Sequence, residues 1–386
     1  MSLKFVIAPD SFKESLSAME AAQAMALGVC EVFPDAQCQC VPMADGGEGT
    51  VSAIVSGTGG RLVQATVTGP LHTPVEASFG LSGDGRTAII EMAAASGLGL
   101  VPPASRNPLH TTSRGTGELI LAALNAGVTL IILGIGGSAT NDAGCGMLHA
   151  LGVLFLDADG REIEHTGGGL ARLARIDASA LDTRLRDTVV DVACDVSNPL
   201  CGPRGASAVF GPQKGATPEM VAQLDANLAR FANCTREALH GSPRADVAQV
   251  PGSGAAGGMG AALYAFLNGA IRPGCDIVAE AVGLEAAIAQ CDIVLTGEGR
   301  MDSQTLSGKA PLGVARLAQK HGKPVIGIGG SVGPDVASLV GEGFAAVVSA
   351  THRPAPLEKI LASGRENVRQ TAASVAALLA LGQKMG

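Results

Sequence analysis

The sequence predicts an α/β protein of two domains, in which an open parallel-sheet domain is made from both chain ends and a mixed α/β domain is inserted into it. Strand–helix–strand units occur at both ends of the chain, and short strands without helices between them occur in the middle. A length of 386 residues suits one large or two ordinary domains. We expect residues 1–59 and 285–386 to form the first domain and residues 60–284 the second.

The N-terminal strand–helix–strand unit begins with the apolar strand "KFVIAPD". A helix follows in "KESLSAMEAAQAMALGVCEVFPD", where Ser17 and Glu20 have the spacing of a capping box and Phe33-Pro34-Asp35 ends the helix. The second strand is "CQCVPM". Two strands joined by a helix predict parallel pairing with a right-handed crossover.

The C-terminal part repeats this alternation. The strands "CDIVLTGEG", "PVIGIGG" and "AAVVSAT" alternate with helical segments, and a closing helix is predicted from about Glu366 to Leu381. Together with the N-terminal pair, these segments predict five parallel strands in one sheet.

The middle of the chain has a different pattern. "GRLVQATVTGP", "VEASFGLSG" and "RTAIIEMA" predict an antiparallel meander, and "TLIILGI" and "TVVDVAC" predict further strands. The long apolar stretch "LILAALNAGVTLIILGIGG" contains Asn125-Ala126-Gly127, which is typical of a helix C-terminus. We therefore interpret this stretch as a core helix and a buried strand rather than a membrane span.

Composition excludes several classes of protein. The net charge is −8 and no Lys/Arg run exceeds two residues, which argues against a nucleic-acid partner. The first residues lack a signal-peptide pattern, and we expect no membrane partner. The nine cysteines are odd in number and irregularly spaced, which predicts reduced, mostly buried thiols and a cytoplasmic protein.

Carboxylates follow most of the predicted strands. In open α/β sheets, ligands bind beyond the carboxyl ends of the strands. One aspartate in such a place is most often a turn residue or a helix cap, but the repetition at five strand ends favours a binding site. The strand-end residues are Asp10, Ser11 and Lys13; Asp45 and Glu48; Ser138, Thr140, Asn141 and Asp142; Asp195; and Glu298, Arg300 and Asp302.

Two glycine-rich loops, "GIGGSATNDAGCG" and "GSGAAGGMGAALYAF", each lead into a helical segment. Both can present backbone N–H groups to an anion such as phosphate, although close helix packing explains the second loop equally well. Isolated basic residues at Lys13, Lys214, Arg300 and Lys309 lie among Gly, Ser and Thr, where a cation can neutralise phosphate.

These groups are the components of a phosphoryl-transfer site that binds Mg²⁺. The GxxxxGK[ST] loop and the HRDxxxxN loop of common kinases are absent from the sequence. One alternative is a nicotinamide-dependent oxidoreductase that uses Gly134, Gly136 and Asp157 as a loose dinucleotide fingerprint. Another is a small-acid binding module without chemistry.

The chain closely resembles the bacterial glycerate kinases of the first type. Seven motifs in order, from near Lys4 to the last helix, carry this resemblance. They are "APDSFKESLSA", "PMADGGEGT", "AIIEMAAASGL", "GIGGSATNDAG", "CDVSNPLCGPRGASAVFGPQKGAT", "GSGAAGGMG" and "TGEGRMDSQT". The resemblance implies ATP-dependent phosphorylation of D-glycerate, usually to 2-phosphoglycerate. It also implies a flavodoxin/Rossmann-like domain with an inserted second domain, and an active-site cleft between them.

With this chemistry we interpret Asp195 as the general base, and Lys13 and Arg300 as ligands of the substrate carboxylate or the transferring phosphoryl group. Asp45, Glu48, Glu298 and Asp302 are candidate Mg²⁺ ligands. The candidates for substrate and phosphate binding are Asp10, Ser11, Gly136, Gly137, Ser138, Thr140, Asn141, Lys214, Gly254, Gly257, Gly258 and Lys309.

Two positions depart from the family pattern: Ala143-Gly144-Cys145 stands where Gly-Gly-Ala is common, and Arg114 stands where an aromatic residue is common. The residues alone leave open whether the 2- or the 3-hydroxyl is phosphorylated, and whether the protein is a monomer or a homodimer.

Overall fold

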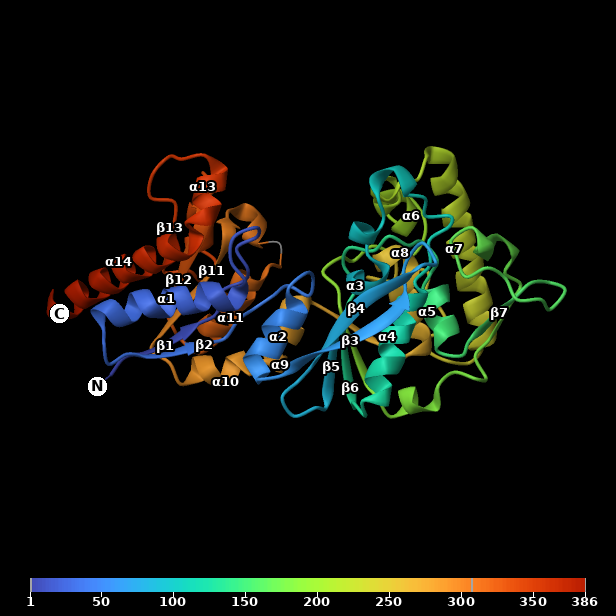
Figure 1. Cartoon of the computed structure of the whole chain (residues 1–386), viewed down its shortest axis with the longest axis horizontal. Helices are drawn as coiled ribbons and strands as arrows, with labels where there is room; N and C mark the ends of the chain where they lie inside the picture. The colour runs from blue at the N-terminus through green and yellow to red at the C-terminus, as the bar shows by residue number, and fades with distance from the viewer. Residues whose placement is uncertain (1, 307, 386) are drawn as a thin grey trace. The chain divides into compact units, whose positions relative to one another are not determined.

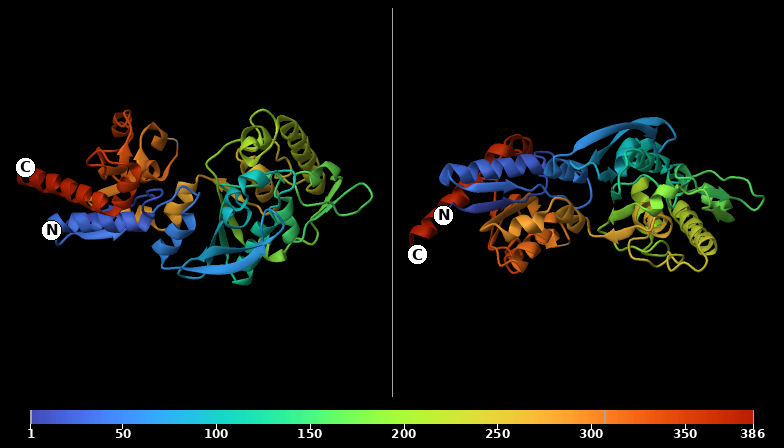
Figure 2. Two further views of the ribbon diagram at one scale, coloured as in Figure 1. Left: turned by 45° about the horizontal axis from the view of Figure 1, so that its top comes forward. Right: turned by 90° about the horizontal axis from the view of Figure 1, so that it is seen from below.

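The computed structural model describes residues 2–306 and 308–385, which fold into two compact α/β units (Figure 1). The first unit comprises Met1–Asp45, Ser52–Gly59 and Cys275–Gly386, and the second comprises Gly46–Val51 and Gly60–Gly274. Both chain ends lie in the first unit (Figure 2). The predicted fold class, with one α/β unit made from both ends and another inserted, is confirmed.

The observed division differs from the predicted boundaries in two places. Residues 46–51 belong to the second unit, and the chain returns to the first unit at Cys275 rather than at residue 285. The return comes earlier because the helices α9 (Gly274–Ala281) and α10 (Leu284–Ala289) pack in the first unit. There, Val282 lies against Gly57 and Cys275 against Gly313. The predicted cleft between the domains stays a prediction.

The first unit contains a five-stranded parallel sheet in the order β13-β12-β11-β1-β2, as predicted. Its hydrophobic core includes Phe5, Ile7, Leu295 and Ile328 from the strands. The strands are β1 (Lys4–Ile7), β2 (Gln37–Cys40), β11 (Ile293–Met301), β12 (Val325–Val332) and β13 (Ala346–Ser349).

Helices cover both faces of this sheet, with α1 and α14 packed against each other on one face (Figure 1). Gly28 in α1 permits this contact, because a Cβ there would collide with the Arg369 carbonyl. The predicted capping box of Ser17 and Glu20 is confirmed. The helices not yet given are α1 (Ala18–Val32), α2 (Thr50–Thr58), α11 (Ala310–Lys320), α12 (Ala337–Val340), α13 (Leu357–Ala362) and α14 (Gly364–Met385), with a 3₁₀ turn at Ser303–Leu306.

The second unit contains a six-stranded mixed sheet in the order β10-β9-β6-β5-β4-β3. The predicted meander forms the antiparallel part, and the strands β5, β6, β9 and β10 run parallel. The strands are β3 (Arg61–Thr68), β4 (Pro74–Leu81), β5 (Thr87–Glu91), β6 (Leu130–Gly134), β9 (Val189–Ala193) and β10 (Ala270–Arg272). Strands β7 (Leu154–Leu156) and β8 (Arg175–Asp177) pair in a separate two-stranded sheet.

The second unit also contains helices and short 3₁₀ turns around a large core. Phe79, Phe155 and Phe231 are among its fully buried side chains. The helices are α3 (Ala93–Ser96), α4 (Arg114–Asn125), α5 (Cys145–Ala150), α6 (Ala206–Phe210), α7 (Pro218–Ala238) and α8 (Ala255–Phe266). The 3₁₀ turns are Leu98–Leu100, Pro103–Ser105, Gly169–Arg172, Thr183–Arg186 and Pro212–Lys214.

The long apolar stretch folds as predicted. Helix α4 ends at Asn125, Gly127 has a positive φ of 82°, and the buried strand β6 follows. Among the described residues, no helix is long and apolar enough to cross a membrane. The prediction of mostly buried cysteines is wrong, because Cys30, Cys38, Cys40, Cys194 and Cys201 are only half-buried. The first three gather where the end of α1 meets the edge strand β2.

Candidate functional site

Three carboxylates of the first unit gather at the carboxyl ends of the neighbouring strands β2, β1 and β11. Asp10 follows β1 and donates its N–H to the Gly297 carbonyl at 2.8 Å, which places it beside Glu298 of β11. Asp45 follows β2. Burial, and after it the negative charges of Asp45 and Glu298, raise the pKa of Asp10 to about 7. Asp10 is therefore close enough to Asp45 and to Glu298 for each of them to repel its charged form.

The Glu298 carboxylate accepts hydrogen bonds from two side chains. Its side chain is only 9% exposed, Thr305 Oγ1 donates to Oε1 at 2.7 Å, and Lys309 Nζ donates to Oε2 at 2.9 Å. Lys309 precedes α11 as its N-cap residue, so the start of this helix positions the ammonium group. The carboxylate is buried but compensated, as a stable buried charge requires.

The remaining charged candidates of the first unit differ in exposure. Arg300 Nε donates to Asp302 Oδ2 at 2.7 Å, and the Gln304 N–H donates to Asp302 Oδ1. Both carboxylate oxygens of Asp302 therefore already accept hydrogen bonds, one from β11 and one from the following turn. Lys13 is exposed and forms no ion pair within the described residues. Ser11 is half-buried, and its N–H donates to Asp10 Oδ1 at 2.6 Å.

The donor set fits a hard divalent cation bound partly by water and phosphate. Asp10, Asp45 and Glu298 supply carboxylate oxygens, and their mutual repulsion would be relieved by a cation. They do not form a group of three ligand atoms within 4.8 Å in the described part of the chain. This arrangement suits Mg²⁺, which commonly takes only one or two protein carboxylates beside substrate phosphates.

The loop that contains Asp45 and Glu48 continues onto the second unit. Gly46 has a φ of 91°, and a Cβ at this position would lie 2.8 Å from Ala193 Cβ. A Cβ at Gly134 would lie 2.5 Å from the Gly46 carbonyl oxygen, so the loop crosses the ends of β6 and β9. Only glycine permits this conformation and this approach. Asp45 is thus grouped with the first unit, and the exposed Glu48 with the second.

Glu91 is a carboxylate of the second unit that the sequence reasoning missed. Its Oε1 accepts the Val51 N–H at 2.9 Å, which ties loop 46–51 to the end of β5. Burial raises the pKa of Glu91, and the nearby charge of Glu48 adds to this effect. Its position at the end of a buried strand, in "AIIEMA", was the available signal.

Asp195 lies two residues beyond β9 at the same edge of this sheet. Its side chain is exposed to solvent, and Oδ1 accepts the Gly274 N–H at 3.0 Å. This hydrogen bond orients the carboxylate without burying it. An oriented and accessible carboxylate is suited to accept a proton from a bound alcohol.

In the first glycine-rich loop the backbone of the glycines is exposed to solvent, and the polar side chains that follow are buried. Gly136 and Gly137 are exposed, and Gly137 has a φ of 74°. Ser138 and Thr140 are buried and contact Lys214, whose Nζ donates to Ser138 Oγ at 2.7 Å and to the Thr140 carbonyl at 2.6 Å. Lys214 is only 2% exposed, and burial lowers its pKa to about 7. In this structure Lys214 stabilises the loop.

Buried polar contacts also hold the end of this loop. Asp142 Oδ2 accepts hydrogen bonds from the Ser113 N–H at 2.9 Å and from Ser113 Oγ at 2.7 Å. Asn141 Nδ2 donates to Ser207 Oγ at 3.2 Å. Both side chains are fully buried, so they position the backbone of the loop.

The second glycine-rich loop packs directly against the first. Ala256, Gly257 and Gly258 have φ values of 52°, 66° and 93°, so the regular part of α8 begins only after them. A Cβ at Gly257 would collide with the Thr140 carbonyl. Gly254 is buried beside the Pro199 carbonyl. These contacts explain the glycines by close packing, the alternative that the sequence left open.

The dinucleotide-binding alternative is wrong. A dinucleotide fingerprint needs its acidic residue after the next strand of the parallel sheet, but β7 belongs to a separate two-stranded sheet. Asp157 is a turn residue there. Its Oδ1 accepts the Asp159 and Arg161 N–H groups, and its Oδ2 accepts from Arg172 at 3.0 Å.

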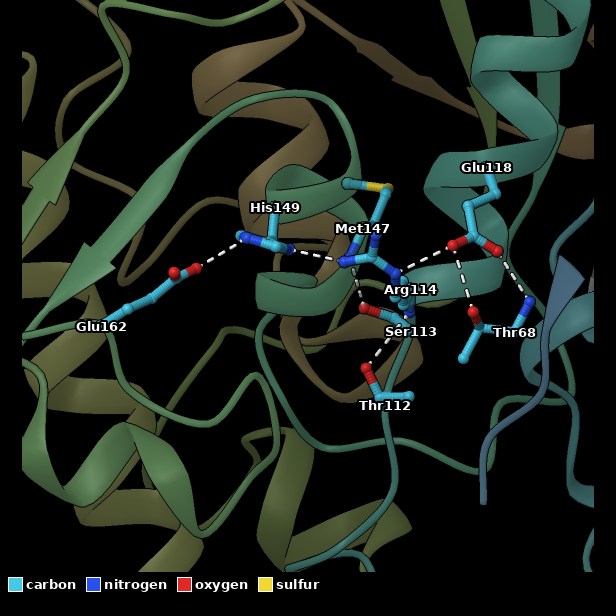
Figure 3. A network of polar contacts seen from close by, with 8 residues as sticks. All are labelled: Thr68, Thr112, Ser113, Arg114, Glu118, Met147, His149 and Glu162. Atoms are coloured by element: carbon cyan, nitrogen blue, oxygen red, sulfur yellow. Dashed lines mark hydrogen bonds and ion pairs between the residues drawn. The ribbon is translucent and has the colours of Figure 1, made fainter. Parts of the chain in front are cut away.

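Arg114, one of the two departures from the family pattern, is part of a polar network on the second unit (Figure 3). Its Nε donates to Glu118 at 2.8 Å, and a terminal guanidinium nitrogen donates to His149 Nδ1 at 2.6 Å. His149 Nε2 lies 2.6 Å from Glu162 Oε1, and His165 Nε2 lies 3.0 Å from the same oxygen. Arg114 and Glu118 have an i, i+4 spacing, but no sequence spacing linked His149 to Arg114 or to Glu162.

Within the described residues, His149, Glu162 and His165 form the one group with metal-binding geometry. The contact with Arg114 argues against a metal, however. Because His149 Nδ1 accepts from Arg114, its ring proton lies on Nε2 and points to Glu162. A nitrogen that carries a proton has no lone pair for a cation.

We expect this histidine pair to reduce stability in mild acid. Burial, and then the His149 ring, lowers the pKa of His165 to about 4, below the unfolded value of about 6.5. The unfolded state therefore binds more protons between these values, and stability is lost as the pH falls from 6.5 toward 4. Thermal unfolding at pH 7.5 and pH 5.0 should show a smaller loss for His165→Gln than for the unaltered protein. Equal losses would contradict this expectation.

Comparisons with known proteins identify relatives along the whole chain. The model of the glycerate kinase family matches residues 5–380. The chain is 55% identical over 382 residues to glycerate 2-kinase of Escherichia coli K12, with 99% of both chains covered. It is 53% identical over 383 residues to glycerate kinase of Bacillus subtilis 168, with 99% of both covered. A crystal structure from Salmonella typhimurium LT2, described as a candidate glycerate kinase 2, has a TM-score of 0.92, 56% identity and full coverage of both chains.

Proposed function

The chain belongs to the glycerate kinase family, and from this premise we propose that it transfers the γ-phosphoryl group of ATP to the 2-hydroxyl of D-glycerate, with Mg²⁺ as the metal. The observation that supports this most is the group of Asp10, Asp45 and Glu298 at the strand ends of the first unit. Repelling carboxylates beside Lys309 and the exposed Lys13 suit a cation and phosphates.

Asp45 and Glu298 are the proposed protein ligands of Mg²⁺. Asp10 is a third proposed ligand, because the charges of Asp45 and Glu298 both raise its pKa and it therefore lies near both. When bound, the cation would neutralise charge on the phosphate oxygens. Asp302 is less suited to this role because Arg300 and Gln304 already occupy its oxygens. Glu48, which lies beside Glu91 in the second unit, stays a predicted ligand.

The cations of the first unit have separate proposed roles. Lys13 is exposed and unpaired within the described residues, so it is suited to bind the substrate carboxylate or a phosphate. Arg300 is 66% exposed and is oriented by Asp302 through Nε, which suits the same role. Lys309 is held by Glu298 and balances its charge when no cation is present.

In the second unit, Asp195 is the proposed general base for the glycerate hydroxyl. The Gly274 N–H fixes its orientation, and its exposure leaves the carboxylate accessible to a substrate. The exposed backbone of Gly136 and Gly137 is the proposed phosphate contact of this unit. The buried polar side chains of this loop and its neighbour have a supporting role in this proposal: they hold the loop backbone in place and do not contact a ligand. They are Ser138, Thr140, Asn141 and Lys214.

One experiment tests both the reaction and which hydroxyl of glycerate is phosphorylated. Purified protein with D-glycerate, ATP and Mg²⁺ should release ADP, and phosphorus NMR should identify 2-phosphoglycerate against authentic 2- and 3-phosphoglycerate. The two hydroxyls lie on adjacent carbons, so a shift of about one bond length in the bound acid exchanges them. Formation of 3-phosphoglycerate without a mutase would overturn the 2-position, and absence of ADP release would overturn the activity.

We expect Asp10→Asn to stabilise the metal-free protein while impairing turnover. The pKa of Asp10 is about 7 in the folded state and 3.8 ordinarily, so the folded state holds more protons between these values. Stability therefore falls as the pH rises from 3.8 to 7, and ionised Asp10 is unfavourable above pH 7. In EDTA at pH 8, Asp10→Asn should raise the melting temperature. At pH 4 the gain should shrink, and a constant gain at both pH values would exclude an electrostatic cause.

A further inference from the structure

A cavity of about 230 Å³ lies in the first unit at the carboxyl ends of β11 and β12 and beyond β13. Gly299, Gly330 and Ala350 come from these strand ends. Apolar walls are added by the buried Phe12 and Val368. The cavity thus combines a glycine-lined edge of the sheet with hydrophobic side chains from the first loop and from α13 and α14.

We propose that this cavity binds the adenine base and part of the ribose of the ATP substrate. The inference rests on the proposed function, because it names where the phosphoryl donor of that reaction is held. A cavity of this size is on the scale of a fused-ring base with part of its sugar. A planar ring gains most from apolar walls such as Phe12, Leu361 and Val368.

Several residues that line the cavity are sequence neighbours of the proposed phosphate and metal ligands. Gly299 lines it and lies directly between Glu298 and Arg300. Phe12 and Lys13 also line it and follow Asp10 by two and three residues. A nucleotide with its base in the cavity would therefore extend its phosphates past Lys13 toward the carboxylates. Glycerate suits this cavity less well than a base does, because Lys13 is the one cation among the described residues that line it and burying a carboxylate against the apolar walls is unfavourable.

Asn367 is the polar group best placed to recognise the base. The hydroxyls of Thr351 and Ser15 are already used, because they donate to the Gly330 carbonyl at 2.6 Å and to the Leu361 carbonyl at 2.7 Å. The half-buried Asn367 lines the cavity, and its side chain has no hydrogen bond within the described part of the chain. The side-chain amide presents an N–H donor and a carbonyl acceptor side by side, which match N7 and the amino group of adenine.

A single tryptophan can report on the cavity because the chain contains none. Leu357 lines the cavity and is 66% exposed, and Leu378 on α14 is 68% exposed and outside it. We expect Leu357→Trp fluorescence to change saturably with ADP and with adenosine, but not with inorganic tripolyphosphate. Leu378→Trp should not respond. If ADP binding, measured by equilibrium dialysis, leaves Leu357→Trp unchanged, the base lies elsewhere and the inference is overturned.

Substitution of Asn367 supplies the second test. Loss of one or two hydrogen bonds to the base should raise the KM for ATP by roughly threefold to tenfold. In Asn367→Leu, kcat and the KM for glycerate should stay within about twofold, and the preference for ATP over GTP should decrease. The control is Asn233→Leu at an exposed position of α7. An unchanged KM for ATP in Asn367→Leu would overturn the role of the amide.

The two proposals fail in different ways. If the protein releases no ADP with D-glycerate but Leu357→Trp still responds to adenosine and ADP, the proposed reaction is wrong and the nucleotide cavity stands. If the protein phosphorylates glycerate with ATP but neither the tryptophan nor Asn367→Leu shows an effect, the reaction stands and the cavity does not hold the base.

Discussion

Asp195→Asn should lower kcat by roughly 10²- to 10⁴-fold, the usual contribution of a general base. The asparagine retains an oxygen that can accept the Gly274 N–H, so the loop should keep its conformation. It cannot take the proton of the glycerate hydroxyl. Because binding of substrate does not need this proton transfer, the KM for glycerate should change little. The measurement is ADP release over a range of glycerate concentrations.

The control for this variant is Asp187→Asn. Asp187 is an exposed carboxyl just before β9, whereas Asp195 lies just beyond its other end. Only the substitution at the carboxyl end of the strand should lower turnover, because ligands of parallel sheets bind at that end. Unchanged turnover in Asp195→Asn would remove the assignment of Asp195 as the base.

Glu298→Gln should lower kcat/KM by about 10²- to 10³-fold, the scale of a lost electrostatic contact in the transition state. The amide has nearly the same shape and can still accept the hydrogen bond of Thr305, but it loses the charge that Lys309 neutralises. It is also a poor Mg²⁺ ligand compared with a carboxylate. The Mg²⁺ concentration that gives half-maximal activity should therefore increase.

Activity of Glu298→Gln is best measured as a titration with Mg²⁺ at saturating ATP. Glu342→Gln, an exposed position of the same unit, provides the matched control. If Glu298→Gln shows normal Mg²⁺ dependence with lower turnover, Glu298 acts through Lys309 and the metal ligands are Asp45 and Asp10. If both turnover and Mg²⁺ dependence are normal, Glu298 has no part in the reaction.

Local patterns in the sequence predicted the framework well. The capping box of Ser17 and Glu20 forms within one helical turn, so residue spacing alone is sufficient evidence for it. The strands of the parallel sheet were recognisable as apolar runs next to turn residues, because buried strands exclude polar side chains on both faces. The rule for strand ends then selected Asp10, Asp195 and Glu298 correctly as residues at the carboxyl ends of sheets.

Contacts between distant segments were not predictable in the same way. Lys214 has a glycine- and threonine-rich context that is typical of a phosphate ligand. It is instead buried and donates to Ser138 and Thr140, which precede it by 76 and 74 residues. The cavity beside Lys13 combines segments near residues 12, 299, 330, 350 and 360, and no local pattern indicates that they meet.

The sequence thus determined the chemical inventory of this protein: the strands, the carboxylates that follow them, and the flexible glycine loops. Only the tertiary structure decided which of these residues belong to the first unit and which to the second. Asp45 and Glu48 are three residues apart, yet Asp45 is grouped with Asp10 in the first unit, while Glu48 lies beside Glu91 in the second. The physical reason is that Gly46 adopts a positive φ against Ala193 and Val51 binds Glu91. Both contacts require a sheet that forms only when distant parts of the chain have folded together.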